Sequence, residues 1–183
     1  MGFLLLILLS CSSLLTDEYP LIYVAHTPPT PTIAVGPPQQ KAQWRSIPNV
    51  RVCATSEVSL SRVAQALRFW KDLGYSFGST VKDPLSTCMN PREGEILITL
   101  PESGFSDKHL ASTRIYTDKY TGYIVKAKIH VLPKNSKKER VIEHELGHAL
   151  GWYHYPQRYH IMHPNWRLGG YERRGLQKQY GSL

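Results

Sequence analysis

One eleven-residue run near the C-terminal end, HELGHALGWYH, constrains this chain most. His144 and His148 are four residues apart, so on a helix both project from one face and can bind the same ion. Glu145 lies beside them, where it could accept a proton from a water that the ion activates. Gly151 can end the helix with a left-handed turn, which would bring His154 back to the ion. The run therefore predicts a catalytic Zn²⁺ site, although a surface helix carrying three histidines is the alternative.

Met162 follows His154 by eight residues, within the sequence HIMHP. Together with the histidine run, it resembles the metzincin zinc endopeptidases, whose zinc motif precedes a methionine-containing turn under the metal. The spacing and the Met-x-Pro order are most similar to the matrixin, matrix metalloprotease-like branch. The stretch from Gly175 to Gly181 is similar to the closing helix of matrixin catalytic domains. The resemblance is strongest from Gly94 onward.

The resemblance implies an α+β or α/β zincin domain. Its expected parts are a twisted, mostly parallel five-stranded sheet with one antiparallel edge strand, an active-site helix and a C-terminal helix. Hydrophobic periodicity predicts compatible elements in that order. Strands are expected at 49–54, 75–81, 95–100, 113–117 and 123–131, with a turn at 118–122. One helix is expected from the cap Ser59 to Gly74, with an apolar face at Leu60, Val63, Leu67 and Trp70. A second helix is expected over 137–150, with an apolar face at Val141, Ile142 and Leu146.

By the same resemblance, the strand at 113–117 is the edge that pairs with an extended peptide substrate. The wall of a substrate pocket is expected within 162–166. An ordinary edge strand without a binding role is the alternative. The residues expected to contact substrate are Thr113, Arg114, Ile115, Tyr116 and Pro164.

The N-terminus predicts export. Residues 3–9 form an apolar run that is too short to span a membrane but suits a signal peptide. The sequence LLSC that ends at Cys11 resembles a bacterial lipobox, so residues 1–11 are expected to be a signal peptide with Cys11 as the lipidation site. No Lys or Arg precedes the apolar run, which leaves ordinary secretion or a retained anchor as alternatives. The expected location is the cell envelope, lipid-anchored at the outer membrane or cell surface, or the exterior.

Residues 12–42 are rich in proline, with Thr and Gln between the prolines, which favours an extended tether before a catalytic domain at 43–183. A propeptide is the alternative, but no Pro-Arg-Cys-Gly motif that would cap the zinc is present. If Cys11 is lipidated, Cys53 and Cys88 remain as an even pair. An exported chain can oxidise such a pair to a disulfide, and two buried thiols are the alternative.

Four other histidines are ambiguous. His160 and His163 flank Met162 and could contact substrate or pack the turn. His109 and His130 suggest the second zinc of animal matrixins, but the remaining ligands of that site are not recognisable, so one catalytic Zn²⁺ is expected. A structural Ca²⁺, which the resemblance allows, has no readable ligand set.

The net charge is +8, with basic residues gathered in 134–140 and 167–178. These clusters favour adhesion to anionic surfaces or acidic substrates, or else they are solvated helix faces. The expected function is zinc-dependent hydrolysis of peptide bonds in a monomer, with extended peptides and a membrane as partners and no nucleic acid. The alternative is a zinc-binding surface lipoprotein without turnover. The intact Glu145 favours the enzyme, because a structural site needs no general base.

Overall fold

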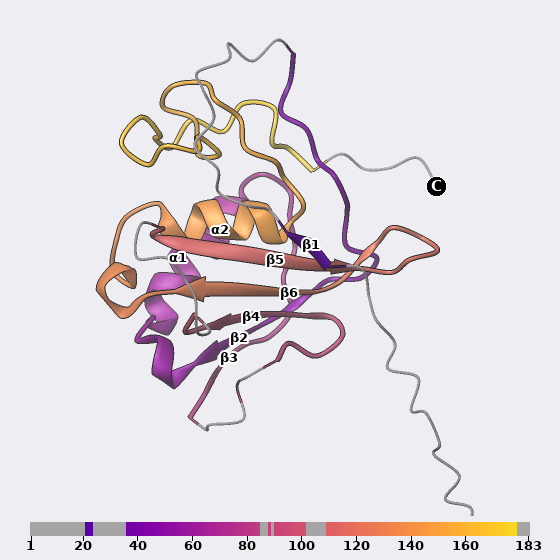
Figure 1. Cartoon of the computed structure of the whole chain (residues 1–183), viewed down its shortest axis with the longest axis vertical. Coiled ribbons are helices and arrows are strands. Elements are labelled where there is room, and N and C mark those ends of the chain that lie inside the picture. Colours follow the sequence, from indigo (N-terminus) through magenta and orange to yellow (C-terminus); the bar gives the residue numbers. More distant parts are fainter. Residues whose placement is uncertain (1–20, 24–35, 85–87, 89, 102–108, 179–183) are drawn as a thin grey trace, which may run out of the picture.

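A computed structural model describes residues 21–23, 36–84, 88, 90–101 and 109–178 (Figure 1). Their main feature is a six-stranded sheet in the order β1-β5-β6-β4-β2-β3. Neighbours among β2, β3, β4 and β6 pair in parallel, whereas β5 is antiparallel to β6 and β1 is antiparallel to β5. The expected five-stranded, mostly parallel sheet is present, and β1 adds a sixth strand. The strands are β1 Leu21–Tyr23, β2 Asn49–Cys53, β3 Thr80–Asp83, β4 Glu95–Thr99, β5 Ala111–Thr117 and β6 Ile124–Val131.

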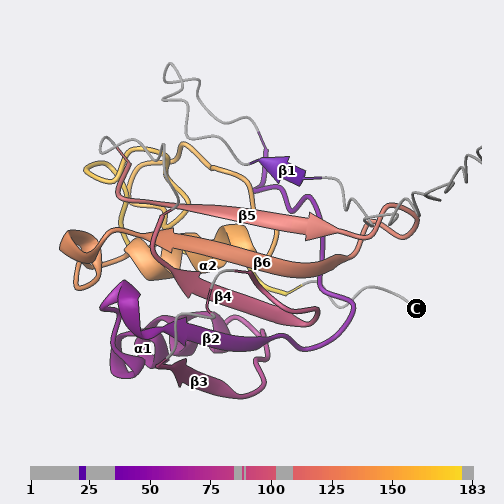
Figure 2. The same ribbon diagram turned by 60° about the horizontal axis from the view of Figure 1, so that its bottom comes forward.

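Two helices, α1 (Leu60–Lys71) and α2 (Val141–Ala149), lie behind the strands in Figure 2. The hydroxyl of Ser59 accepts a hydrogen bond from the Arg62 amide, so the predicted cap begins α1. Its predicted apolar face is buried except at Leu60, which is 40% exposed in the first turn. Short 3-10 turns, η1 (Ala54–Ser56) and η2 (Pro133–Asn135), follow β2 and β6.

The start of α2 is fixed against α1 by polar contacts through one residue. Arg62 forms a two-pronged ion pair with the Glu143 carboxylate, with Nη1 2.7 Å from Oε1. The indole Nε1 of Trp70 donates to the Glu143 carbonyl at 2.8 Å. The side chains of Arg62 and Glu143 are both largely buried. The position of α2, and with it that of His144, therefore depends on α1.

Some predicted boundaries were wrong. The strand expected at 75–81 is β3, which begins at Thr80. Tyr75 and Phe77 are instead buried in the core before the chain reaches the sheet. The second helix begins at Val141 rather than at 137, because Arg140 takes a left-handed conformation with φ +66° that cannot continue a helix. The expected C-terminal helix is not found within the described residues 175–178, where Leu176 is buried in irregular backbone; residues 179–181 lie outside the described part.

Two parts of the expected tether belong to the folded domain. Residues 21–23 form β1, and residues 39–42 contact the end of α2, together with the two residues that follow the expected tether, Gln43 at the start of β6 and Trp44 at the end of α2. The amide of Lys41 donates to the Gly151 carbonyl at 2.8 Å, and the amide of Ile124 donates to the Gln43 carbonyl at 2.8 Å. Backbone pairing accounts for this order where composition alone indicated a mobile spacer. Residues 24–35, between these two parts, lie outside the described residues.

Other N-terminal predictions are not addressed by the fold. The expected signal peptide, residues 1–11, and the lipidation site Cys11 lie outside the described residues. None of the described helices has the length and apolar character needed to cross a membrane.

Cys53 and Cys88, the residues expected to pair, are joined by a disulfide with their Cα atoms 5.7 Å apart. The bond ties the end of β2 to the segment that precedes β4. Both sulfurs pack against Leu97 in a small apolar cluster separate from the main core. The disulfide therefore supports the side of the sheet formed by β2, β3 and β4.

Candidate metal centre

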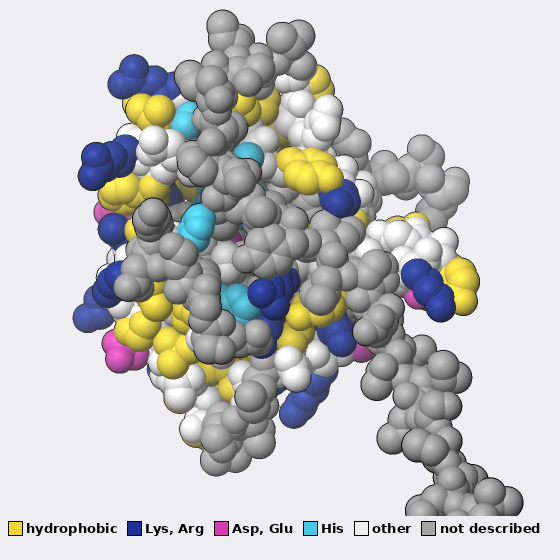
Figure 3. All heavy atoms as spheres, viewed as in Figure 1, with side chains coloured by type: hydrophobic (Ala, Val, Ile, Leu, Met, Phe, Trp, Pro, Cys, Tyr) yellow, Lys and Arg dark blue, Asp and Glu magenta, His cyan; other side chains and the backbone are white. Residues whose placement is uncertain are grey.

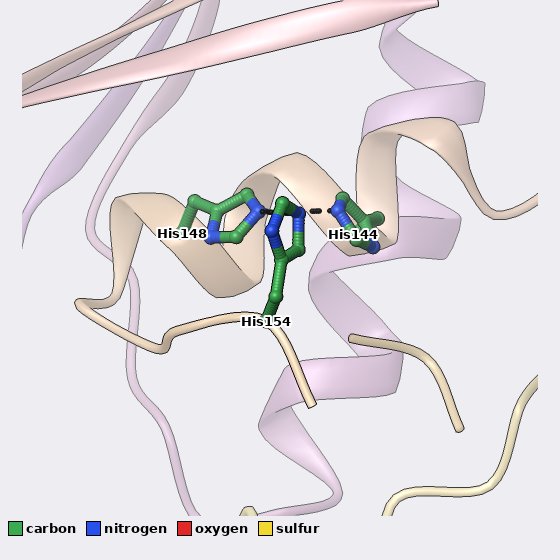
Figure 4. A group of neighbouring side chains, drawn as sticks. All are labelled: His144, His148 and His154. Carbon is green, nitrogen blue, oxygen red and sulfur yellow. Dashed lines mark hydrogen bonds between the residues drawn. The ribbon is translucent and has the colours of Figure 1, made fainter. Parts of the chain in front are cut away.

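Three imidazole rings converge at one point beside α2. His144 and His148 project from the helix, and His154 reaches them from the loop that follows it (Figure 4). The Nε2 atom of His148 lies 3.1 Å from Nε2 of His144 and 3.1 Å from Nε2 of His154. In the described part of the chain, this trio is the group of His, Cys, Asp or Glu residues that could hold a metal ion.

The tautomers of two rings fit a metal. The Nδ1–H of His144 donates to the Ile161 carbonyl at 2.7 Å, and that of His148 donates to the Trp152 carbonyl at 2.7 Å. A neutral ring that carries its proton on Nδ1 presents a lone pair at Nε2. Lone pairs that face each other at this distance repel unless a cation lies between them. Ligand nitrogens on a tetrahedral zinc are about 3.3 Å apart, so the observed spacing suits such an ion.

Gly151 makes the turn that returns the chain to the two helical histidines. It takes φ +93°, and its amide donates to the His148 carbonyl at 2.8 Å. The absence of a side chain also lets residues 39–44 approach the end of α2. There Trp44 Nε1 donates to the Ala149 carbonyl and Gln40 Nε2 to the Leu150 carbonyl, each at 2.8 Å. These bonds satisfy carbonyls that a helix end leaves without partners.

Gly151→Ala should destabilise the domain by more than about 2 kcal/mol and weaken metal binding. A Cβ at this position would overlap the Ala42 carbonyl oxygen and strain the left-handed backbone. Chemical denaturation and metal titration measure the two effects. Gly122→Ala is the matched control, because Gly122 has φ +72° but open space around its Cα, so strain alone should cost about 1 kcal/mol. Equal losses in both variants would contradict the role given to the close approach.

Met162 packs against α2, the helix that carries His144 and His148. It is fully buried, and its sulfur lies so close to Gly147 of α2 that a Cβ there would overlap it. The amide of Met162 donates to Nδ1 of His160 at 3.1 Å, and Nε2 of His160 donates to the Arg174 carbonyl at 3.2 Å. His160 therefore packs the methionine turn, which is one of the two roles expected for it.

Glu145 is buried where α2 contacts β5. The hydroxyl of Thr113 donates to its carboxylate at 2.6 Å and lies 3.1 Å from its carbonyl. Burial raises the pKa of Glu145 to about 8, and the bond from Thr113 opposes that rise. Burial also lowers the pKa of His144 to about 4. Without a metal, burial thus favours the neutral forms of Glu145 and His144.

These shifts predict how the stability of the metal-free protein depends on pH. In the unfolded chain Glu145 ionises near the ordinary glutamate pKa of 4.5, whereas the folded state keeps the proton to about pH 8, so this residue destabilises the fold as pH rises across that window. Glu145→Gln removes the effect. In chelator, the variant should exceed the wild type in unfolding free energy by more than about 1 kcal/mol near pH 8, with little difference near pH 4.5.

Urea denaturation at both pH values measures the difference. The wild-type curve alone is less informative, because the lowered pKa of His144 makes the fold lose stability as pH falls from 6.5 toward 4. Glu139→Gln, at an exposed position on the approach to α2, serves as the control and should show no such pH-dependent difference. A constant difference between Glu145→Gln and the wild type at all pH values would contradict the burial account.

The residues expected to contact substrate fall into two groups. Thr113 and Ile115 are buried and face the core, whereas Arg114 and Tyr116 are half-buried on the alternate positions of β5. Pro164 is half-buried in the loop after Met162. Of these five residues, Thr113 is the one whose side chain donates a hydrogen bond to Glu145, the predicted catalytic residue. The predicted edge is itself paired, because β1 lies along β5.

The other histidines among the described residues lie apart from the trio. The amide of Asn165 donates to Nδ1 of His163 at 2.9 Å, which places that ring within its own loop. His130 lies on β6, 3.5 Å from the Ser112 hydroxyl, and His109 precedes β5. Within the described residues, neither belongs to a group of metal-ligating side chains.

Histidine side chains reach the surface on the face shown in Figure 3, among separate groups of Lys and Arg side chains. Part of the basic cluster at 134–140 is engaged with an aromatic ring. Lys138 and Arg140 lie 5.0 and 4.8 Å from the centroid of Trp166. These two cations therefore hold the loop after Met162 as well as contributing positive charge.

Sequence reasoning missed several residues that shape the site. The side-chain bond of Thr113 to Glu145 and the ion pair of Arg62 with Glu143 join residues far apart in the chain. Nothing local in the sequence indicates either pair. A capping function for residues 39–44 could have been suspected from Trp44, a large aromatic residue at the end of a polar, proline-rich segment.

No protein-family model matches the sequence, and no curated protein matches it.

Proposed function

We propose that the chain is a zinc-dependent endopeptidase of the metzincin type, in the matrixin branch. The observation that carries the proposal is the convergence of three imidazole Nε2 atoms, two from α2 and one from the loop after it, with Glu145 on the same helix. A structural zinc site is normally closed by four protein ligands, whereas catalytic sites use three and leave a position open. Among the described residues, no fourth ligand joins this trio.

Zinc is the proposed ion, held by His144, His148 and His154. Neutral imidazoles are ligands for zinc as well as copper, iron and nickel, and the tetrahedral spacing favours zinc. When bound, zinc supplies a Lewis acid that polarises water and the peptide carbonyl. The carbonyls of Ile161 and Trp152 hold two of the rings in the tautomer that this requires.

Glu145 is the proposed general base. A cation held by the three histidines would lower the pKa of Glu145 from its metal-free value, so the carboxylate would accept the proton of the attacking water and pass it to the leaving nitrogen, which completes hydrolysis without another residue. Thr113 would hold the carboxylate in place through its hydroxyl. An extended substrate would pair with β5, so that backbone hydrogen bonds bind the peptide while side chains alternate between the two faces.

Thr113→Val should lower kcat about tenfold, because it removes one hydrogen bond to a charged group while leaving the core shape. KM and zinc content should stay unchanged, since the side chain touches neither the ligands nor a substrate strand. Thr113→Ser keeps the hydroxyl and should keep most of the activity. Steady-state kinetics of the three proteins measure this, and equal activity of the valine and serine variants would contradict the positioning role.

The location proposed is the cell envelope or the exterior, with a lipid on Cys11. The leader sequence and the Cys53–Cys88 disulfide support this, since disulfides persist in oxidising compartments. Labelling with a radioactive fatty acid in cells, compared with Cys11→Ser, tests the lipid. Equal labelling of both proteins would contradict it.

The proposed activity is tested with a pooled library of fluorogenic peptides. The zinc-loaded chain should cleave part of the library, lose activity in chelator and regain it when zinc is added back. Glu145→Ala should bind zinc without cleavage. If the zinc-loaded wild type cleaves no peptide across the library, the enzyme proposal fails and a binding or structural role for the metal remains.

A further inference from the structure

We propose that β1, Leu21–Tyr23, is a built-in competitor for the substrate-binding edge of β5. This inference rests on the proposed function, because it concerns the strand along which a substrate would lie. Competition by β1 would regulate access of substrate to the site without a cysteine bound to the metal.

The pairing of β1 carries the proposal. Leu21 pairs with Tyr116, Ile22 with Ile115 and Tyr23 with Arg114, in antiparallel register. β5 pairs with β6 along its other side, so β1 occupies the one side of β5 that an incoming strand could use. Two strands cannot pair with the same edge together. The position of β1 in Figures 1 and 2 is therefore the position expected for a substrate backbone.

The register also brings β1 to the reactive end of the edge. Tyr23, the last residue of β1, pairs with Arg114, which is the neighbour of Thr113. The hydroxyl of Thr113 donates to the Glu145 carboxylate. The paired segment thus ends within one residue of the strand position that holds the proposed general base, and it competes where a substrate must bind.

Covalent linkage strengthens this competition. β1 and residues 36–44 belong to one chain, so the pairing is intramolecular. An intramolecular partner competes at an effective concentration that reaches the millimolar range for short linkers, which exceeds the concentration of most substrates. If β1 occupies the edge nine-tenths of the time, the apparent affinity for a substrate falls about tenfold, while turnover of bound substrate is unchanged.

The test uses the full-length chain with Leu21→Pro and Ile22→Pro combined. Amides of adjacent residues in a strand point to opposite sides, so the double change removes whichever one donates to β5. Leu21→Val with Ile22→Val is the matched control, because it keeps both amides and the preference for a strand. Circular dichroism and the melting temperature confirm that the proline variant retains the fold.

Occupancy is measured without turnover. Amide hydrogen exchange within Ala111–Thr117 should be at least about tenfold faster in the proline variant than in the wild type or the valine control. A labelled synthetic peptide of residues 19–24 should bind the proline variant at least about tenfold more tightly than the wild type. Unchanged exchange together with unchanged peptide binding would overturn the proposal.

Competition is measured with a library peptide that the chain cleaves. The proline variant should show a KM about tenfold lower with unchanged kcat, and the valine control should match the wild type. An unchanged KM would overturn the competitor role. Mass spectrometry that finds the wild-type chain cut and its N-terminal fragment released would also overturn it, because the segment would then be a substrate. Absence of all turnover, with altered exchange and peptide binding, would defeat the peptidase proposal but support competition for the edge.

Discussion

Glu145→Gln is expected to lower the rate of peptide hydrolysis by about 10²–10⁴-fold, the range attributed to general acid–base catalysis. The amide cannot accept the proton of the attacking water at neutral pH, and the burial of this position leaves little room for a substitute base. Zinc should stay bound at one ion per chain, because Glu145 is not among the three ligands. Steady-state kinetics and elemental analysis of the purified protein measure the two quantities.

Glu139→Gln is the matched control for this result. It makes the same chemical change at an exposed carboxylate on the approach to α2, and it should keep wild-type activity. A Glu145→Gln variant with full zinc content and more than about a tenth of wild-type activity would contradict the general-base role. A variant that loses zinc would instead show that the carboxylate supports the metal.

His154→Ala should remove both zinc and turnover. This residue is the ligand supplied by the loop after Gly151, so its loss leaves only the two helical imidazoles. Losing an outer-shell partner of a metal typically costs about 10–100-fold in affinity, and losing a direct ligand should cost more. Zinc affinity can be measured by competition with a chromophoric chelator, beside the activity of the same sample.

His154 is half-buried and lies outside the helix, so its truncation should leave the fold intact. His109→Ala provides the comparison, because that histidine is outside the trio and should leave zinc affinity unchanged. Retention of wild-type zinc affinity by His154→Ala would mean that the ion is held elsewhere.

The geometry of the metal centre follows closely from sequence spacing. Residues four apart on a helix share a face, and a glycine that ends the helix allows a left-handed turn, which is what Gly151 makes with φ +93°. The β5–β6 hairpin was predictable for a similar reason, since alternating apolar residues flank a polar turn that ends at Gly122. Local rules suffice where a few neighbouring residues decide the backbone.

Features that depend on distant pairing could not be predicted. β1, Leu21–Tyr23, is a short apolar stretch inside a proline-rich segment, and the strand with which it pairs lies far along the chain. Residues 39–44 are ordered because the carbonyls at the end of α2 need donors. The late start of α2 at Val141 reflects a left-handed residue, Arg140, which the helical pattern did not reveal.

The most direct test of the central claim is to incubate an unfolded protein with the full-length chain carrying one zinc ion, and to identify new termini by mass spectrometry. The account predicts new termini at internal peptide bonds, none in chelator, and none with Glu145→Gln at equal zinc content. Absence of internal cleavage by the zinc-loaded wild type, or equal cleavage by Glu145→Gln, would contradict it.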